Sequence, residues 1–294
     1  MPRRHPDRSV FEAKRVIIEE VFGPHPESVF YERQLQVQLE KRFFHWITGY
    51  ALHELCQEGA IRTERLPLLG QTRIRFYWSN TLRSWKRTAN HIVKLVARYS
   101  VPEFAIAIGV HGETMFDAAL PKVGFVPKAW NVRTYGGRST ERLKNLDRVA
   151  ERDGIEYGVE IKNTLDYIGR DEFHEKLLIC KDLALRPLFI CRALPKSYVM
   201  EVIRAGGFAL IFDWRLYLHG YKSFAEEVRA ELGLRVDSPA RIADGTLDRL
   251  VGIHTRIRDR VGAWSQEPVW PEEAGGEESE EEDWVDGEER GMQI

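Results

Sequence analysis

Two carboxylates and one amine that could act together lie on either side of the dipeptide Asp153-Gly154. Asp-Gly between two runs of mostly alternating polar and apolar residues predicts a two-residue β-hairpin turn. Counting outward from that turn places Asp147 opposite Glu160, and the period of two places Lys162 on the face of Glu160. Opposed residues have Cβ atoms ~4.5–5.5 Å apart. Two carboxylates at that spacing repel each other, and a divalent cation would relieve the repulsion.

The same register places an arginine on the inner face of the hairpin. Arg148 falls opposite Val159, on the side that we expect to be buried. A buried guanidinium is costly unless it is paired. The register therefore predicts that Arg148 has either a partner or an exit to solvent.

The set formed by Asp147, Glu160, Ile161 and Lys162 resembles the motif of the PD-(D/E)XK nuclease superfamily, the restriction-endonuclease-like proteins. The resemblance implies that Asp147, Glu160 and the Ile161 carbonyl bind Mg²⁺ or Mn²⁺. It also implies that Lys162 positions or activates the attacking water. Leu146 stands where the family usually has a proline. The alternative is an ordinary surface hairpin with an ion pair between Glu160 and Lys162.

A helix is expected before the hairpin and carries a further candidate ligand. Ser100 and Pro102 predict its start, and it should run to about Leu120. Metal-dependent members of the family often have a glutamate on this helix, so the resemblance implies a catalytic and metal-binding role for Glu113. His111 is a weaker candidate. An exposed helix glutamate with no role is the alternative.

The elements after the hairpin complete a possible core. Residues 171–185 predict a helix, with His174, Lys176 and Lys181 on or near the face toward the site. Residues 188–191 form a near-continuous apolar run, as a buried central strand requires. A helix, strands with a hairpin, a second helix and a buried strand follow one another in the order that the resemblance implies.

The first part of the chain predicts three helices and a two-stranded hairpin. The helices are expected at about 10–21, 31–42 and 45–57, and the strands at 60–65 and 72–78. This order resembles a winged helix-turn-helix domain, which places its third helix in the major groove and its wing on the backbone or minor groove. A protein-interaction module is the alternative. The wing side chains that would bind nucleic acid are Arg62, Arg65, Arg73 and Arg75.

We therefore expect an α/β protein with an N-terminal winged helix (α+β), followed by a restriction-endonuclease-like αβββαβ core with a mixed central sheet. The winged helix should cover residues 1–79, a linker helix 80–99 and the nuclease domain 100–262. Residues 263–294 are expected to be a disordered acidic tail.

A basic loop is expected between a first strand at 123–126 and the hairpin. It contains Trp130 and Tyr135 for stacking and Gly136-Gly137 for flexibility. Guanidinium groups suit phosphates, so the loop is a candidate grip on a nucleic acid. A surface loop without a partner is the alternative. Its candidate nucleic-acid-binding side chains are Lys128, Arg133, Arg138 and Arg142.

The charge is divided unevenly along the chain. Residues 267–294 contain 12 acidic residues and one basic residue, a net charge of −11, so the other 266 residues carry +9 within a total of −2. A basic body suggests a polyanionic partner. Cys56, Cys180 and Cys191 lie in apolar contexts and predict reduced thiols in the cytoplasm. No signal peptide and no membrane span are predicted.

These features together predict an Mg²⁺-dependent endonuclease that hydrolyses phosphodiester bonds, with DNA favoured over RNA. A non-catalytic winged-helix DNA-binding regulator with a degenerate nuclease fold is one alternative. A junction resolvase is another, and it should be a symmetric dimer. The sequence leaves open whether the protein forms a homodimer.

Overall fold

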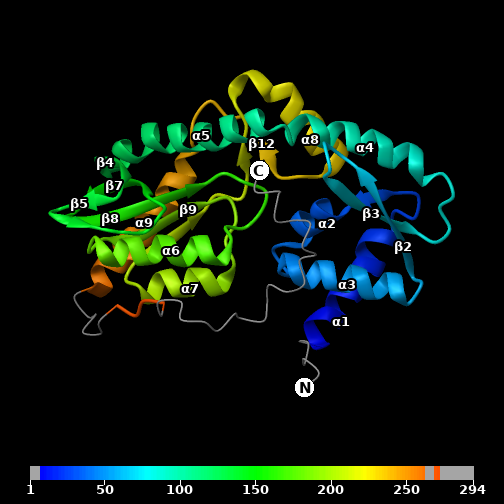
Figure 1. The fold of residues 1–294 in the computed structure, drawn as a ribbon, viewed down its shortest axis with the longest axis horizontal. Helices are drawn as coiled ribbons and strands as arrows, with labels where there is room; N and C mark the ends of the chain where they lie inside the picture. Colours follow the sequence, from blue (N-terminus) through cyan, green and yellow to red (C-terminus); the bar gives the residue numbers. More distant parts are fainter. Residues whose placement is uncertain (1–6, 262–267, 272–294) are drawn as a thin grey trace. The chain divides into compact units, whose positions relative to one another are not determined.

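The computed structural model describes residues 7–261 and 268–271 of the chain. They form a mixed α/β protein that divides into two compact units, each with a hydrophobic core (Figure 1). Among the described residues, unit 1 comprises 7–105 and 223–235, and unit 2 comprises 106–222, 236–261 and 268–271.

Unit 1 contains the three helices and the hairpin that the sequence predicts. The hairpin strands join a third, short strand in an antiparallel sheet of order β1-β3-β2. The sequence did not reveal β1, because three residues are too few to show a period. Apolar side chains of the helices and the sheet share one core. The elements are α1 (Asp7–Val16), the π-helical η1 (Ile17–Phe22), β1 (Val29–Tyr31), α2 (Glu32–Leu39), α3 (His45–Gln57), β2 (Ile61–Pro67) and β3 (Arg73–Ser79).

The helix predicted as a linker, α4 (Trp85–Tyr99), belongs to unit 1. Trp85 stacks on Trp78 of β3 with ring centroids 4.0 Å apart. The hydroxyls of Tyr99 and Tyr31 lie 2.5 Å apart. The apolar face of α4 therefore packs on the sheet of unit 1, while its role as a linker helix stays a prediction.

The helix α8 (Lys222–Leu232) begins at the edge of unit 2, and the rest of it belongs to unit 1. Within unit 1, Glu227 of α8 forms an ion pair with Arg98 of α4 at 2.7 Å. The Gln38 side chain donates a hydrogen bond of 3.1 Å to the Leu232 carbonyl. Chain order had assigned α8 to the nuclease domain, but its apolar face packs on the first unit.

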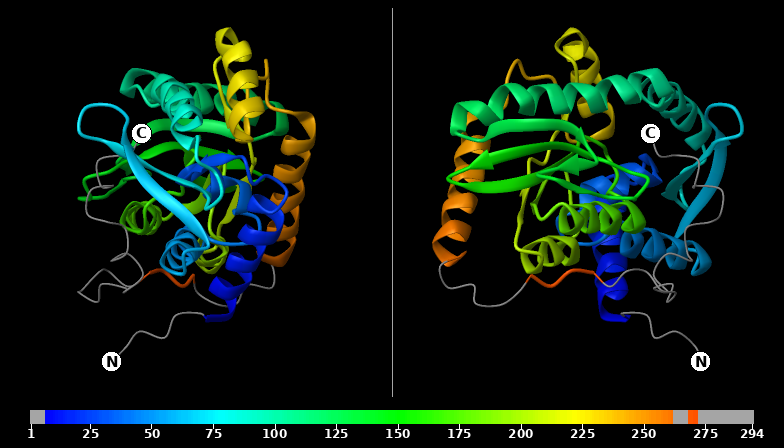
Figure 2. Two further views of the ribbon diagram at one scale, coloured as in Figure 1. Left: turned by 90° about the vertical axis from the view of Figure 1, so that its right-hand side faces the viewer. Right: turned by 60° about the vertical axis from the view of Figure 1, so that its left-hand side comes forward.

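Unit 2 is built on a five-stranded sheet of order β10-β9-β8-β7-β4. β4, β7 and β8 are antiparallel, whereas β8, β9 and β10 are parallel. Helices α5 and α9 cover one face and α6 and α7 the other (Figures 1 and 2). The elements of this sheet and its helices are α5 (Pro102–Ala119), η2 (Leu120–Val123), β4 (Val126–Val132), β7 (Leu146–Arg152), β8 (Ile155–Lys162), α6 (Arg170–Asp182), β9 (Arg186–Cys191), α7 (Lys196–Arg204), β10 (Phe208–Ile211) and α9 (Asp244–Val261). The remaining elements are β5 (Thr134–Tyr135), β6 (Arg138–Ser139), β11 (Arg215–Leu216), η3 (His219–Tyr221) and β12 (Val236–Asp237).

The hairpin between β7 and β8 has the predicted register. Arg152 pairs with Ile155, and Arg148 pairs with Val159. Asp153 and Gly154 have φ of 52° and 75°. Positive φ at both central residues is the requirement of a type I′ turn, and this is why Asp-Gly predicted the turn.

A histidine of α9 binds the side chain of Asp153 in this turn. The imidazole of His254 is buried, with Nε2 3.0 Å from Asp153 Oδ2 and Nδ1 3.0 Å from the Tyr157 hydroxyl. Since the carboxylate can only accept, Nε2 donates to Asp153 and Nδ1 accepts from Tyr157. Arg258 also pairs with Asp153, at 3.1 Å. The turn is therefore fixed to α9.

The first strand of the sheet lies later in the chain than predicted. Residues 123–125 belong to a 3₁₀ turn and its end, and β4 runs from Val126 to Val132, inside the segment expected to be a loop. The pairing of β4 with β7 shifts between Pro127 and Ala129. This bulge interrupts the period of two, so the strand was not visible in the sequence. The rest of the predicted loop contains the β5–β6 hairpin.

Most of the predicted acidic tail lies outside the described residues, but a short part of it is placed on unit 2. The Val269 N–H donates a hydrogen bond of 2.9 Å to the Arg204 carbonyl, and Trp270 packs against the apolar clusters beside α6 and α7. Within the described part of the chain, no helix combines the length and apolar character that a membrane crossing needs.

Candidate active site

Asp147 and Glu160 lie where β7 and β8 part. The ladder between the strands ends at Arg148 and Val159. Beyond the end of the ladder, Asp147 Oδ2 accepts a hydrogen bond of 2.7 Å from the Ile161 N–H. The partner of this backbone amide is therefore a side chain. The other oxygen, Oδ1, accepts no hydrogen bond from the described residues. The Asp147 carboxyl is thus fixed by the backbone beside Glu160.

The Glu160 carboxylate is buried between two lysines. Its side chain is 2% exposed, with Oε1 3.2 Å from Lys162 Nζ and Oε2 2.6 Å from Lys176 Nζ. Both contacts are close enough for ion pairs, but neither oxygen accepts a hydrogen bond of good geometry. The charge of Glu160 is therefore balanced while both oxygens keep acceptor capacity. Buried oxygens in this state are suited to a further cation.

Burial and charge crowding act together on Asp147. Its pKa is raised from 3.8 to about 8, first because burial disfavours the carboxylate and then because Glu160 is negatively charged. Lys176 and the Ile161 N–H oppose the shift. The carboxyl therefore takes up a proton near neutral pH when no other cation is present. A divalent cation would remove the cause of the shift by neutralising the pair.

Lys162 is positioned as a charged group. Its Nζ lies 2.6 Å from Glu172 Oε1 on α6 and 3.2 Å from Glu160. Burial acts to lower the pKa of Lys162, but Glu160 and Glu172 outweigh it and the pKa is raised. The ammonium stays protonated over the physiological pH range. It can orient a water or stabilise developing negative charge, but it cannot take up a proton.

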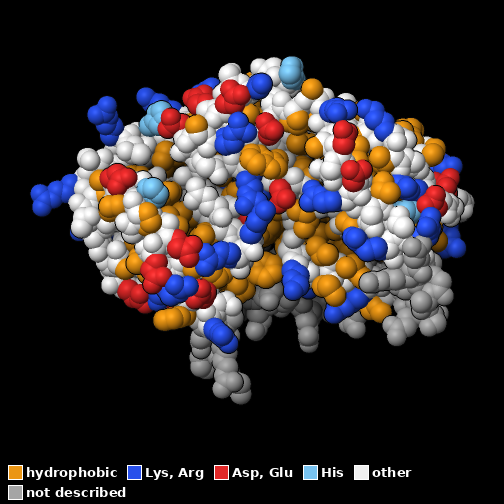
Figure 3. All heavy atoms as spheres, turned by 180° about the vertical axis from the view of Figure 1, so that it is seen from behind, with side chains coloured by type: hydrophobic (Ala, Val, Ile, Leu, Met, Phe, Trp, Pro, Cys, Tyr) orange, Lys and Arg blue, Asp and Glu red, His pale blue; other side chains and the backbone are white. Residues whose placement is uncertain are grey.

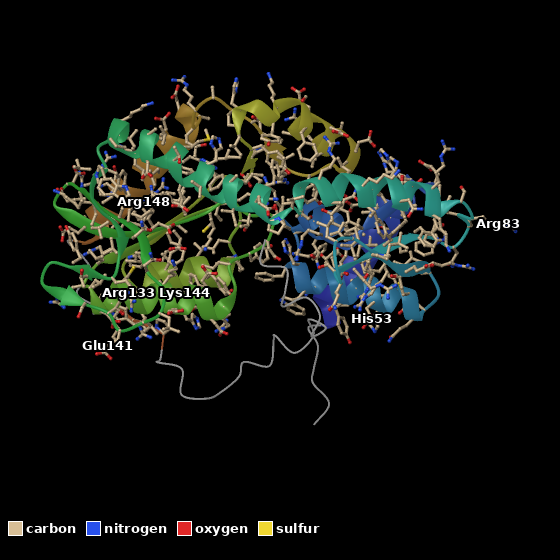
Figure 4. The ribbon with its side chains drawn as sticks, turned by 45° about the horizontal axis from the view of Figure 1, so that its top comes forward. His53, Arg83, Arg133, Glu141, Lys144 and Arg148 are labelled. Carbon is tan, nitrogen blue, oxygen red and sulfur yellow. The ribbon has the colours of Figure 1, made fainter. Side chains whose placement is uncertain are left out.

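Arg148 has the partners that its buried position requires. The residue is 1% exposed and forms an ion pair with Asp117, and its NH2 lies 3.4 Å from Glu113 Oε2. Both acids belong to α5. Figure 4 shows Arg148 under this helix, on the face of the sheet opposite α6. The prediction that the buried Arg148 has a partner is therefore confirmed.

The same contact draws Glu113 away from the two strand carboxylates. Glu113 is 39% exposed and pairs with Arg148 on the α5 face, whereas Glu160 faces α6. Its charge still contributes to the raised pKa of Asp147, as the smallest cause. No group of three or more His, Cys, Asp or Glu side chains suited to a metal occurs in the described residues. A metal would thus rest on Asp147 and Glu160, and ligation by Glu113 or the Ile161 carbonyl stays a prediction.

Helix α6 supplies more of the site than the sequence indicated. Lys176 is 4% exposed, and its Nζ contacts Glu160 and lies 2.5 Å from the Asn145 carbonyl. Glu172, one turn earlier, holds Lys162, and the sequence gave no signal for it because acidic residues in a first turn are common. His174 pairs instead with Glu201 on α7.

The wing arginines do not form one surface. Arg65 and Arg75 are opposed in the ladder and share a face, but Arg75 is half-buried with its NH1 3.8 Å from Glu32. Arg73 is exposed on that face and donates to the Arg65 carbonyl at 3.1 Å. Arg62 pairs with Trp78 and faces the opposite side. Only part of the predicted set is therefore available to a single ligand.

The basic segment between β4 and β7 lies partly along α6. Arg142 forms an ion pair of 3.1 Å with Asp182 of α6, and Arg133 donates to the Arg142 carbonyl at 2.6 Å (Figure 4). Lys128 pairs with Glu151 of β7 at 3.1 Å. Arg138 is exposed at the β5–β6 hairpin. Arg138 is thus the member of this set that is most available to a ligand.

Basic and acidic side chains are interspersed on the face of the molecule drawn in Figure 3. The net charge of the body therefore does not by itself locate a binding surface. Comparison with known protein families, with curated proteins and with solved structures gave no match to this chain. The case for a function rests on the arrangement of its own residues.

Proposed function

We propose that the chain is a metal-dependent nuclease that hydrolyses phosphodiester bonds, with DNA as the favoured substrate. The arrangement at the open end of β7 and β8 carries the proposal. Burial of Asp147 first, and the charge of the neighbouring Glu160 second, raise the pKa of Asp147 to about 8, and a protonated Lys162 stands beside the two carboxylates. Such a crowded pair with an adjacent ammonium is typical of a site that binds a cation and a phosphate.

The fold of unit 2 supports the proposal. Helix α5, the antiparallel strands β4, β7 and β8, helix α6 and the parallel strand β9 follow the order αβββαβ that the resemblance to PD-(D/E)XK nucleases implies. Asp147 lies on β7, and Glu160 and Lys162 lie on β8, which supports the resemblance. The order of helices and strands in unit 1 likewise supports a winged helix.

The residues suit phosphodiester hydrolysis in distinct roles. Asp147 and Glu160 would hold Mg²⁺ or Mn²⁺, which neutralises phosphate charge and lowers the pKa of a bound water. Lys162 is held by Glu172 at 2.6 Å, so its ammonium is oriented before substrate arrives. It can donate hydrogen bonds to the attacking water or to a phosphate oxygen, where negative charge increases in the transition state.

Cleavage of plasmid, single-stranded and branched DNA, with RNA alongside, tests the proposal in the presence of Mg²⁺ or Mn²⁺. We expect Asp147→Asn, Glu160→Gln and Lys162→Ala each to lower the rate by at least ~10²-fold while leaving DNA binding intact. Glu156→Gln is a matched control, because Glu156 is exposed on the same strand and bonded to Tyr135. Normal cleavage by the three site variants would refute the proposal.

A second candidate is a DNA-binding regulator without catalysis. It is favoured by the two lysines around Glu160, which balance its charge without a metal. On this reading the wild-type protein binds DNA but cuts none of the substrates, and divalent cations leave its stability unchanged. The cleavage assay and a stability measurement with and without Mg²⁺ separate the two candidates.

A further inference from the structure

Basic side chains without acidic partners lie on α4 of unit 1, on the turn before it and on the sheet face that α4 covers. Each is exposed, and within the described residues none takes part in an ion pair. They differ in this from Arg75 of the wing and Arg142 of unit 2, which contact acids. We call them the α4 basic surface, which consists of Arg62, Arg83, Lys86, Arg87 and Lys94.

A pair of stacked tryptophans connects the members of this surface. Arg62 is opposite Trp78 in the β2–β3 ladder, so both lie on one face of the sheet. Trp78 stacks on Trp85 with centroids 4.0 Å and planes 12° apart, and Lys86 Nζ lies 5.5 Å from the Trp85 ring. The strand arginine and the first turn of α4 therefore flank the same two buried rings.

The surface extends along α4 and then ends. Arg87 and Lys94 are seven residues apart, which corresponds to about 10.5 Å of helix and places them on nearly the same side. Further along, Arg98 meets Glu227 of α8 at 2.7 Å and its charge is balanced. His91, in the second turn, lies 3.5 Å from Glu231 of α8, whereas among the described residues no acid forms an ion pair with the first turn of α4. Like charges held together in this way repel each other, and a polyanion would relieve the repulsion.

The third helix offers no comparable charge. α3 contains neither lysine nor arginine, and its exposed side chains include Trp46 and His53 (Figure 4). A helix of this composition cannot neutralise phosphates along a groove. If unit 1 binds DNA, most of its backbone contacts must come from another element.

The surroundings of the surface favour a phosphate backbone over other polyanions. No large apolar side chain of β3 or α4, the two elements that contain the stacked tryptophans, is exposed. A membrane surface or an amphipathic peptide would need such side chains for anchorage. We propose that the α4 basic surface binds the sugar–phosphate backbone of duplex DNA and makes the main electrostatic contact of unit 1. This inference rests on the proposed DNA substrate.

Binding of a labelled duplex to the full chain in EDTA tests the inference, because no cleavage then interferes. The triple variant Arg83→Gln, Lys86→Gln, Arg87→Gln should bind at least tenfold more weakly. The slope of log affinity against log salt should fall by about 2–3, at ~0.9 for each lost phosphate contact. The matched control removes the same charge from exposed lysines of other helices and turns. It is Lys122→Gln, Lys196→Gln, Lys222→Gln, and it should keep the wild-type slope.

Circular dichroism must show that both triple variants are folded. Equal losses in the two triples, or no loss in the first, would overturn the inference. It would also be overturned if the first triple lost binding to polyglutamate or phosphatidylserine vesicles but not to DNA. Cleavage is read separately: the first triple should raise the KM for DNA while kcat with Mg²⁺ is unchanged. Binding without cleavage in the wild-type protein would refute the nuclease proposal and leave this inference standing.

Discussion

Replacing Lys176 by methionine should destabilise the protein far more than the same change elsewhere on α6. The ammonium of Lys176 lies 2.6 Å from Glu160 Oε2, and the two side chains are only 5% and 2% exposed. Methionine keeps the volume of the lysine stem and suits a helix, so the change removes the charge and the hydrogen bond to the Asn145 carbonyl and little else. Glu160 would remain buried with one cation instead of two.

The size of the effect follows from these contacts. Removing one partner of a buried ion pair costs roughly 3–5 kcal/mol of stability. Glu160 retains Lys162 at 3.2 Å, which lowers the loss. We therefore expect a loss of about 2–4 kcal/mol in the absence of metal. With a urea dependence of about 2 kcal/mol per molar, the midpoint should fall by about 1–2 M.

Urea unfolding in EDTA measures this loss, and Lys181→Met is the matched control. Lys181 is exposed on the same helix, so its replacement should change stability by no more than about 0.5 kcal/mol. Adding Mg²⁺ or Mn²⁺ should restore more stability to Lys176→Met than to the wild-type protein, because a bound cation would replace the missing charge. If the two variants unfold alike in EDTA, the burial of an ion pair at Glu160 is not what stabilises this site.

Two further predictions concern the protonation of Asp147 and the packing of α5. The carboxyl of Asp147 has a pKa of about 8 in the folded protein, compared with its ordinary value of 3.8. Between these two pH values the folded state retains a proton that the unfolded chain loses. Stability should fall as the pH rises from about 4 to 8 in EDTA, and Asp147→Asn should flatten that slope; equal slopes would contradict it. A Cβ at Gly112 would lie 2.6 Å from Asn163 Cβ, whereas one at Gly109 meets nothing within 4 Å. Gly112→Ala should therefore lower the thermal midpoint and Gly109→Ala raise it by the equivalent of about 0.5–1 kcal/mol, and the reverse order would refute the packing.

The chemistry of the hairpin could be predicted because it depends on neighbours in the sequence. Asp153-Gly154 fixes the turn by its positive φ, and the period of two then determines which residues face each other. Asp147 and Glu160 follow from that count alone. The sequence also placed Lys176 on the face of its helix toward the site, because the period of α6 and the direction of β8 could both be predicted.

What could not be predicted depends on contacts between distant segments. The pairing of Arg148 with Asp117 requires knowing how α5 lies on the sheet. The placement of α8 in unit 1 requires knowing which core its apolar face covers. The positions of the wing arginines were partly predictable. Arg62 and Arg65 are three residues apart on β2, so the period of two already places them on opposite faces of the sheet. The sequence could not show that Glu32 would take up Arg75.

The pairing of Glu160 with two lysines gives the site a property that the motif alone does not. Lys176 reaches Glu160 from α6, whereas Lys162 reaches it along β8. Any divalent cation must share or displace these ammonium groups, so its affinity is reduced by the ion pairs that already exist. Phosphate would reverse this balance, because it brings negative charge that Lys162, the more exposed of the two lysines, can bind. We therefore expect metal and nucleic acid to bind cooperatively, each more tightly in the presence of the other. The Mg²⁺ affinity should be measured with and without DNA, on the wild-type protein and on Lys162→Ala. If DNA leaves the Mg²⁺ affinity of both proteins unchanged, the lysines do not couple metal binding to DNA binding.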